Sequence, residues 1–257
     1  MKVVILAGGY GTRLSEETVV KPKPMVEIGG RPILWHIMKL YSHYNFNEFI
    51  ICLGYKGDII KDYFVNYSDR DSDILVNTST GEIEKIGSRT PNWKVWLIDT
   101  GKETMTGGRL KRVMNHIDGD TFMMTYGDGV SDVNIGKLLR FHNSHGKLVT
   151  VTAVQPEGRF GALSLTEAGN VSHVVEKPLR DGGWVNSGFF VINKEALNLI
   201  RGDDTIWEME PLESLATSGN LMAHRHSGFW KPMDTLSDKN SLEKLWNSGS
   251  PPWKVWK

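Results

Sequence analysis

The chain has 257 residues, and its 30 lysines and arginines balance its 30 aspartates and glutamates, so the formal net charge is zero. This balance argues against general binding to nucleic acid or to anionic membranes, and no stretch approaches the roughly 18 apolar residues of a membrane span. The single cysteine, Cys52, lies in an apolar run, so we expect a core thiol in a cytoplasmic protein without disulfides. The N-terminal apolar stretch is too short for a signal peptide. We predict one α/β domain over residues 1–257, a length that can bury a substantial core.

The first predicted element is a short strand at residues 2–6 that ends in a glycine-rich turn. Its apolar, β-branched run is typical of a strand buried on both faces. Gly8, Gly9 and Gly11 allow positive φ and let a ligand lie directly against the main chain. Backbone N–H groups in such a turn bind anions, and Arg13 adds a planar set of charged donors.

The segment Lys-Pro-Lys-Pro-Met at residues 21–25 follows this turn and cannot be helical, because each proline restricts the residue before it. Two known phosphate loops do not fit the turn. The Walker loop requires Gly-Lys-Ser or Gly-Lys-Thr where this chain has Gly-Thr-Arg, and the dinucleotide fingerprint requires a glycine at Leu14. The glycines alone would indicate an ordinary βα turn, but with Arg13 and Lys23 the pattern predicts a polyphosphate site.

The next segments alternate between helix and strand. We predict a helix over residues 31–40, a buried strand over 48–53 and an amphipathic helix over 56–67, which implies parallel strands joined by right-handed crossovers. His36 lies among the apolar residues of the first helix, so we expect a packed histidine. The polar residues 68–92 indicate a hairpin-like excursion that could be a lid, a subunit contact or a loop.

A strand over residues 93–97 leads to a predicted helix over 106–116, with Thr106 as its N-cap. Arg109 in its first turn would by itself be read as a solvated side chain. A strand over residues 121–125 follows and ends at Asp128, which stands between two glycines where open α/β sheets bind ligands. A carboxylate there suits Mg²⁺, although turn aspartates also bond their own backbone.

In the second half we predict a strand over residues 149–154, a meander over 158–178, a helix over 205–217 capped by residue 204 or 205, and a strand over 221–226. A closing helix over 237–246 follows Asp234, which could be its cap. We assign four histidines to the surface rather than to zinc, because no cysteine or carboxylate clusters beside them: His142, His145, His224 and His226. Four tryptophans suggest packing on a neighbouring subunit or on the chain's own domain: Trp230, Trp246, Trp253 and Trp256.

Residues 6–14 and 21–25 together resemble the signature of the sugar-1-phosphate nucleotidylyltransferases, and the resemblance extends from Met1 to the C-terminal tryptophans. It implies a Rossmann-like fold with a mixed, mostly parallel twisted sheet flanked by helices and a small β excursion. Residues 1–130 would mainly bind nucleotide and residues 131–257 mainly sugar phosphate. The implied reaction is Mg²⁺-assisted attack of a sugar phosphate on the α-phosphorus of a nucleoside triphosphate, in a homo-oligomeric enzyme.

The base is suggested by residues 105–109, Met-Thr-Gly-Gly-Arg, which resemble the subfamily that uses CTP and glucose 1-phosphate. The chain lacks the Gln-Pro-x-Gly-Leu-Ala motif of thymidylyl and uridylyl relatives. Cytosine presents acceptors at O2 and N3, which suit the pure donor Arg109, whereas uracil and thymine present an N3–H. The product, CDP-glucose, would supply dideoxyhexose synthesis for surface polysaccharides. Another base or hexose, or a non-catalytic sugar-nucleotide sensor, remain alternatives.

The resemblance also implies a role for each site residue. Arg13 would hold the departing pyrophosphate, Lys23 would bring the reacting phosphates together, and Asp128 and Asp234 would bind Mg²⁺. The sugar phosphate would contact Gly161, Glu176, Lys177 and Asn186. The nucleotide would contact Leu6, Ala7, Gly8, Gly9, Tyr10, Gly11, Thr12, Arg13, Lys23, Thr104, Arg109 and Asp128.

Overall fold

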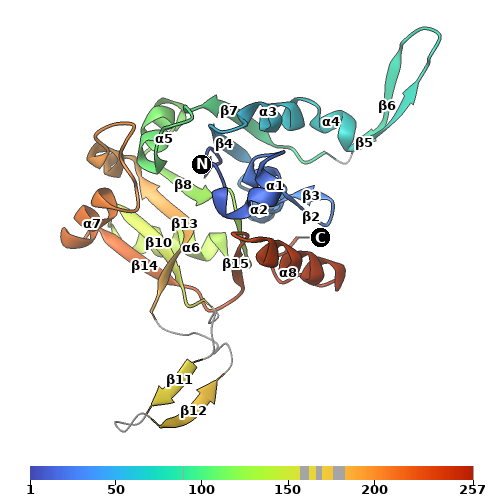
Figure 1. The fold of residues 1–257 in the computed structure, drawn as a ribbon. Coiled ribbons are helices and arrows are strands. Elements are labelled where there is room, and N and C mark those ends of the chain that lie inside the picture. Colours follow the sequence, from blue (N-terminus) through green and yellow to red (C-terminus); the bar gives the residue numbers. More distant parts are fainter. Residues whose placement is uncertain (89, 157–161, 166–169, 176–182, 257) are drawn as a thin grey trace.

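A computed structural model describes residues 1–88, 90–156, 162–165, 170–175 and 183–256. Its centre is a seven-stranded sheet in the order β14-β10-β13-β8-β1-β4-β7 (Figure 1). The strands are β1 (Val3–Leu6), β4 (Glu48–Leu53), β7 (Lys94–Asp99), β8 (Thr121–Tyr126), β10 (Val149–Val154), β13 (Val185–Asn193) and β14 (Leu221–Arg225). All neighbouring pairs are parallel except those of β13, which is antiparallel to β8 and β10. The predicted fold class is confirmed.

Helices cover both faces of this sheet. One face carries α2 (Ile33–His43), α3 (Gly57–Val65), α6 (Ile135–His145) and α8 (Leu236–Asn247). The other face carries α5 (Thr106–Val113), the 3₁₀ helix η4 (Lys194–Leu199) and α7 (Glu210–Thr217). Within the described residues, no helix combines the length and the apolar character that a membrane crossing needs.

Strand β1 separates two hydrophobic cores, as its apolar run predicts. Val3 and Ile5 belong to the core beneath α2, whereas Val4 and Leu6 belong to the core beneath α5 and α7. Side chains alternate between the two faces of a strand, so a strand that is covered on both faces has no polar position. Because both faces of β1 are packed in these cores, the end of the strand is held in place, and the glycine turn starts from this fixed point.

Short elements complete the fold. They are η1 (Thr12–Leu14), α1 (Ser15–Thr18), η2 (Lys23–Met25), the paired strands β2 (Glu27–Ile28) and β3 (Arg31–Pro32), the paired strands β9 (Gly129–Ser131) and β15 (Trp230–Pro232), and η3 (Met114–His116). Pro32 is extended, with ψ 144°, so α2 begins at Ile33 rather than at the predicted residue 31. The helix predicted over residues 56–67 is interrupted at Asn66, after which α4 (Tyr67–Arg70) begins.

The helix predicted over residues 205–217 is wrong in its first turn. The carbonyl of Thr205 accepts hydrogen bonds from the backbone N–H groups of Gly107, at 2.9 Å, and Gly108, at 3.3 Å. It therefore satisfies the first turn of α5 instead of starting a helix of its own. Helix α7 begins at Glu210, with Pro211 in its first turn, where a missing N–H costs nothing.

Two hairpins project from the body of the molecule (Figure 1). The predicted excursion forms β5 (Ser72–Val76) and β6 (Ile83–Ser88), an antiparallel pair. The predicted meander includes a second antiparallel pair, β11 (Ala162–Leu165) and β12 (Val171–Val175).

The C-terminal tryptophans pack on the chain's own domain. Trp253 and Trp256 are buried and lie with Trp246 around His36, and the Trp246 and Trp253 rings are stacked 6.4 Å apart. His36 Nε2 lies 2.8 Å from the carbonyl oxygen of Ile28, so the predicted packed histidine is confirmed. Burial lowers its pKa to about 4, which keeps the ring neutral at physiological pH.

The surface assignment of the histidines is wrong for His142. This side chain is 4% exposed, and its Nδ1 lies 2.9 Å from Thr150 Oγ1, which also lies 2.7 Å from His145 Nε2. His226 Nε2 pairs with Asp132 Oδ1 at 2.9 Å. Among the residues that the structure describes, no three His, Cys, Asp or Glu side chains cluster as a metal site would require.

Candidate functional site

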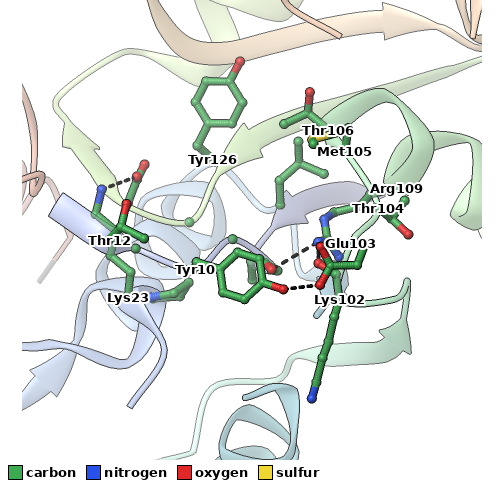
Figure 2. Close-up of a pocket in the computed structure, with 18 of the residues that line it drawn as sticks. Tyr10, Thr12, Lys23, Lys102, Glu103, Thr104, Met105, Thr106, Arg109 and Tyr126 are labelled. Atoms are coloured by element: carbon green, nitrogen blue, oxygen red, sulfur yellow. Dashed lines mark hydrogen bonds and ion pairs between the residues drawn. The ribbon is translucent and has the colours of Figure 1, made fainter. Parts of the chain in front are cut away.

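A cavity of about 380 Å³ opens at the carboxyl ends of β1 and β8 (Figure 2). The twelve residues predicted to bind nucleotide all line it, together with Lys102, Glu103, Met105, Thr106 and Tyr126. A second cavity, of about 250 Å³, adjoins the first and shares Arg13, Tyr126 and Asp128 with it. Asn186 and Asp234 line this second cavity. Gly161, Glu176 and Lys177 lie outside the described residues.

Of the three turn glycines, Gly11 has the positive φ that glycine allows, whereas Gly8 and Gly9 do not. Gly11 has φ +64°, a left-handed conformation that favours glycine, and it precedes η1. A Cβ atom on Gly8 would lie 2.2 Å from the Arg109 guanidinium, so this position also needs glycine. The turn therefore lines the cavity with its main chain and leaves room for the Arg109 guanidinium.

Lys23 is the centre of the charged part of the site. Its Nζ lies 2.7 Å from Asp128 Oδ2 and 2.6 Å from Asp234 Oδ1, and Arg13 Nη1 lies 3.0 Å from Asp234 Oδ2. Burial alone would lower the pKa of Lys23, but the two carboxylates outweigh burial and raise it. The lysine is therefore a fixed positive charge at the junction of the two cavities.

The two aspartates meet because of the short ladder between β9 and β15. Gly129 pairs with Pro232, and the backbone N–H of Met233 donates to the carbonyl of Asp128 at 2.8 Å. Asp128 and Asp234 thus stand side by side at the end of this ladder. Asp234 is not the cap of α8, because Thr235 caps that helix and forms a capping box with Asp238. The Asp234 carboxylate is consequently available to the site.

Arg109 is buried at the base of the larger cavity rather than solvated. Its Nη1 donates to Leu53 O at 3.0 Å, Thr100 Oγ1 at 2.7 Å and Gly101 O at 2.7 Å, and its Nη2 donates to Gly8 O at 3.1 Å and Lys102 O at 3.2 Å. Arg109 thus joins the segments at the ends of β1, β4 and β7. Burial lowers its pKa from the usual value of an arginine.

Thr106 is the first residue of α5 and not its predicted N-cap, a position that Met105 occupies. Its hydroxyl donates to Glu208 Oε2 at 2.6 Å and accepts from the backbone N–H of Trp207 at 2.9 Å. The other oxygen of Glu208 accepts from the hydroxyl of Tyr126. The Thr106 side chain therefore serves a tertiary network that local sequence patterns do not indicate.

Sequence analysis missed the roles of Glu103 and Tyr126, which line the cavities, and of Glu208, which bonds to Tyr126. The Tyr10 hydroxyl donates to Glu103 Oε1, which joins the glycine turn to the segment before α5 (Figure 2). Tyr126 lines both cavities and Glu208 holds it. Tyr126 could have been noticed because it directly precedes Gly127 and Asp128, but no motif marks Glu103 or Glu208.

Asp128 and Asp234 suit a divalent cation whose remaining ligands come from the substrate. The Asp128 and Asp234 carboxylates both pair with Lys23 Nζ in this structure, and such hard oxygen donors are the ligands that Mg²⁺ prefers. In the described part of the chain no third His, Cys, Asp or Glu joins them. Mg²⁺ usually keeps several waters and binds one or two carboxylates plus substrate phosphates, so the donor set fits that ion.

The chain matches the model of the nucleotidyl transferase family over residues 2–229 and belongs to that family. Glucose-1-phosphate cytidylyltransferases of Salmonella typhi and Salmonella typhimurium are each 56% identical to it over 257 residues, covering 100% of both chains. The crystal structure of HddC from Yersinia pseudotuberculosis superposes with a TM-score of 0.71 at 25% identity, covering 95% of this chain and 99% of HddC. HddC has also been solved in complex with GMP-PN.

Proposed function

We propose that the chain transfers the cytidylyl group of CTP to α-D-glucose 1-phosphate, giving CDP-glucose and pyrophosphate. One observation carries the proposal: the glycine turn, Lys23 and the two aspartates meet where a nucleotide-sized cavity adjoins a smaller one. Two substrates that react through their phosphates need such adjoining cavities with charge at the junction. The full-length similarity to two glucose-1-phosphate cytidylyltransferases supports this choice of substrates.

The reaction needs alignment more than covalent catalysis, because the nucleophile is already an anionic phosphate. The triphosphate lies along the backbone of residues 8–12, with Arg13 on the departing pyrophosphate. Lys23, at the junction of the cavities, contacts the two reacting phosphates and offsets their repulsion. The sugar phosphate oxygen attacks the α-phosphorus in line, and the bond to pyrophosphate breaks.

Asp128 and Asp234 are the residues that would hold Mg²⁺, which supplies charge neutralisation and orientation for the phosphate oxygens. Arg109 and Thr104 line the base end of the larger cavity. A guanidinium can only donate hydrogen bonds, which matches the O2 and N3 acceptors of cytosine, and pairing through its Nη groups requires Arg109 to release protein acceptors that they hold in this structure. A sugar-nucleotide sensor would not need Arg13, Lys23, Asp128 and Asp234 together at the junction, so we prefer the enzyme.

Pyrophosphate release with Mg²⁺ tests this proposal directly. CTP, UTP, dTTP and GTP are each paired with the 1-phosphates of glucose, galactose and mannose. We expect release only when both substrates are present, and fastest for CTP with glucose 1-phosphate. Faster release with another pair would correct the base or the hexose, and no release with any pair would refute the enzyme.

We also propose that the chain works as a homo-oligomer in the cytoplasm. The hairpin of β5 and β6 supports an oligomer, because it exposes aliphatic side chains far from the core. These are Ile74, Leu75, Val76, Ile83 and Ile86. Sedimentation of the purified chain as a monomer would refute this part.

A further inference from the structure

Tyr126 occupies the wall between the two cavities, and packing fixes its ring. Gly188 has φ +87°, and a Cβ there would lie 2.5 Å from Tyr126 Cδ2, so glycine allows the ring to lie against β13. Phe190, from the same strand, meets the ring edge-on, with centroids 6.3 Å apart. Figure 2 shows Tyr126 and Thr106 on the same side of the larger cavity. The phenol is thus held in place before any substrate arrives.

The direction of the hydrogen bond from Tyr126 is fixed as well. Glu208 is an acceptor when ionised, so the Tyr126 hydroxyl must donate its proton to Oε1. Burial, followed by the charge of Glu208, raises the pKa of Tyr126, which keeps this proton on the phenol. The phenol oxygen can then only accept a hydrogen bond from a ligand.

Glu208 is itself held on both sides. Thr106 donates to its Oε2 at 2.6 Å, and the hydroxyl of Thr106 is in turn oriented by the N–H of Trp207. Trp207 is fully buried in the core beneath α5, which anchors the turn that carries Glu208. Both oxygens of the Glu208 carboxylate are therefore held by hydrogen bonds from the protein.

Asn186 supplies the complementary group in the smaller cavity. Its Oδ1 accepts the backbone N–H of Gly188 at 2.8 Å, which turns Nδ2 toward Tyr126. The distance from Nδ2 to the Tyr126 hydroxyl is 3.4 Å, long for a hydrogen bond, so a ligand can engage both groups. The site thus offers one hydrogen-bond acceptor, the Tyr126 oxygen, and one donor, Asn186 Nδ2. Their separation suits two neighbouring hydroxyls of a ligand.

We propose that Tyr126 binds a substrate hydroxyl beside Asn186, and that Glu208 is the positioning residue that makes the phenol an acceptor. The pair would recognise a vicinal diol, one hydroxyl donating to Tyr126 and its neighbour accepting from Asn186. The hexose is the expected source, because Asn186 lines only the smaller cavity, and the ribose of the nucleotide is the other source. This inference rests on the proposed function.

The test compares wild type with Tyr126→Phe, which keeps the ring and removes the hydroxyl. The value of kcat/KM is measured for glucose 1-phosphate and its 2-, 3- and 4-deoxy analogues, and for CTP and its 2′- and 3′-deoxy analogues. Wild type is expected to lose about three- to tenfold on one hexose analogue. Tyr126→Phe is expected to treat that analogue and glucose 1-phosphate alike, and a changed ratio on a ribose analogue would assign the diol to the nucleotide. Unchanged ratios for every analogue would overturn the inference.

Glu208→Gln tests positioning, because glutamine cannot accept from both Tyr126 and Thr106 in the present geometry. We expect KM for the hexose phosphate to rise about three- to tenfold with KM for CTP and kcat unchanged. The double variant with Tyr126→Phe should lose no more than Tyr126→Phe alone. Equal losses for both substrates, or additive losses in the double variant, would show a merely structural role. Tyr63→Phe, on α3 away from both cavities, is the matched control.

Failure of the proposed function can be distinguished from failure of the inference about the diol. If wild type turns over no pair of substrates, the proposed function is wrong. The diol is then tested by calorimetric titration of the same sugar 1-phosphates and nucleotides into wild type and Tyr126→Phe, with the same comparison of ratios. Absence of binding by all of them would overturn this inference too.

Discussion

Lys23 lies between two carboxylates that are far apart in the sequence. Its segment was recognised from the sequence because two prolines impose an extended backbone and because lysine has few structural uses there. Its ion pairs with Asp128 and Asp234 depend on tertiary structure. The sequence therefore indicated a cationic partner for phosphate but could not show which anions hold it in place.

Lys23→Ala is expected to reduce kcat/KM by more than about a hundredfold, because it removes preorganised charge from the reacting phosphates. The far-UV circular dichroism spectrum should stay native. Lys21→Ala is the matched control, since Lys21 belongs to the same segment but pairs with Glu27 at 3.2 Å. Its activity should stay within about twofold, because surface ion pairs contribute little. A near-native rate for Lys23→Ala would remove the lysine from the mechanism.

At the scale of elements, long uniform patterns were predictable and short tertiary pairings were not. The buried runs of β1, β4 and β8 gave correct strands, because continuous β-branched and apolar residues have few other structures. Residues 205–209 have a helical pattern, but their backbone instead meets the first turn of α5. The ladder of β9 and β15, which aligns the aspartates, is too short for any periodicity to reveal.

The start of α8 fixes the segment that carries Asp234, so its cap should matter for stability. Thr235→Ala removes the side chain that accepts from the N–H of Asp238 at 3.2 Å. We expect the free energy of unfolding to fall by about 1 kcal/mol, measured by urea denaturation. Ser237→Ala, in the exposed first turn of the same helix, is the control and should change stability by less than about 0.5 kcal/mol. Equal effects of the two substitutions would contradict the capping role.

At the scale of the whole molecule, one sheet with two cores supports adjoining cavities at the carboxyl ends of its strands. The sequence predicted this sheet and the edge at which the cavities open, because parallel α/β topology places sites there. It left open whether the C-terminal tryptophans pack on the chain's own core or on a neighbouring subunit. Trp253 and Trp256 enclose His36, and only tertiary structure shows that they do so within one chain.

The buried His36 makes stability depend on pH. Its folded pKa is about 4, below the unfolded value of 6.5, so the unfolded chain binds the proton more readily. The contribution is complete above about pH 6.5 and is lost as pH falls toward 4, by up to about 1.4 kcal/mol per pH unit. We expect His36→Gln to flatten the fall of the melting temperature over this range, whereas His43→Gln, exposed on the same helix, should not. Parallel curves for wild type and His36→Gln would contradict this linkage.

The central claim is that the glycine turn, with Arg13 and Lys23, binds a nucleoside triphosphate. Isothermal titration calorimetry of the purified chain with CTP in excess Mg²⁺ tests it most directly. We expect a saturable heat of binding at one site per chain, weakened at least about tenfold in Arg13→Ala. No heat with CTP, UTP, dTTP or GTP would contradict the claim, and the assignments of base and sugar would be lost with it.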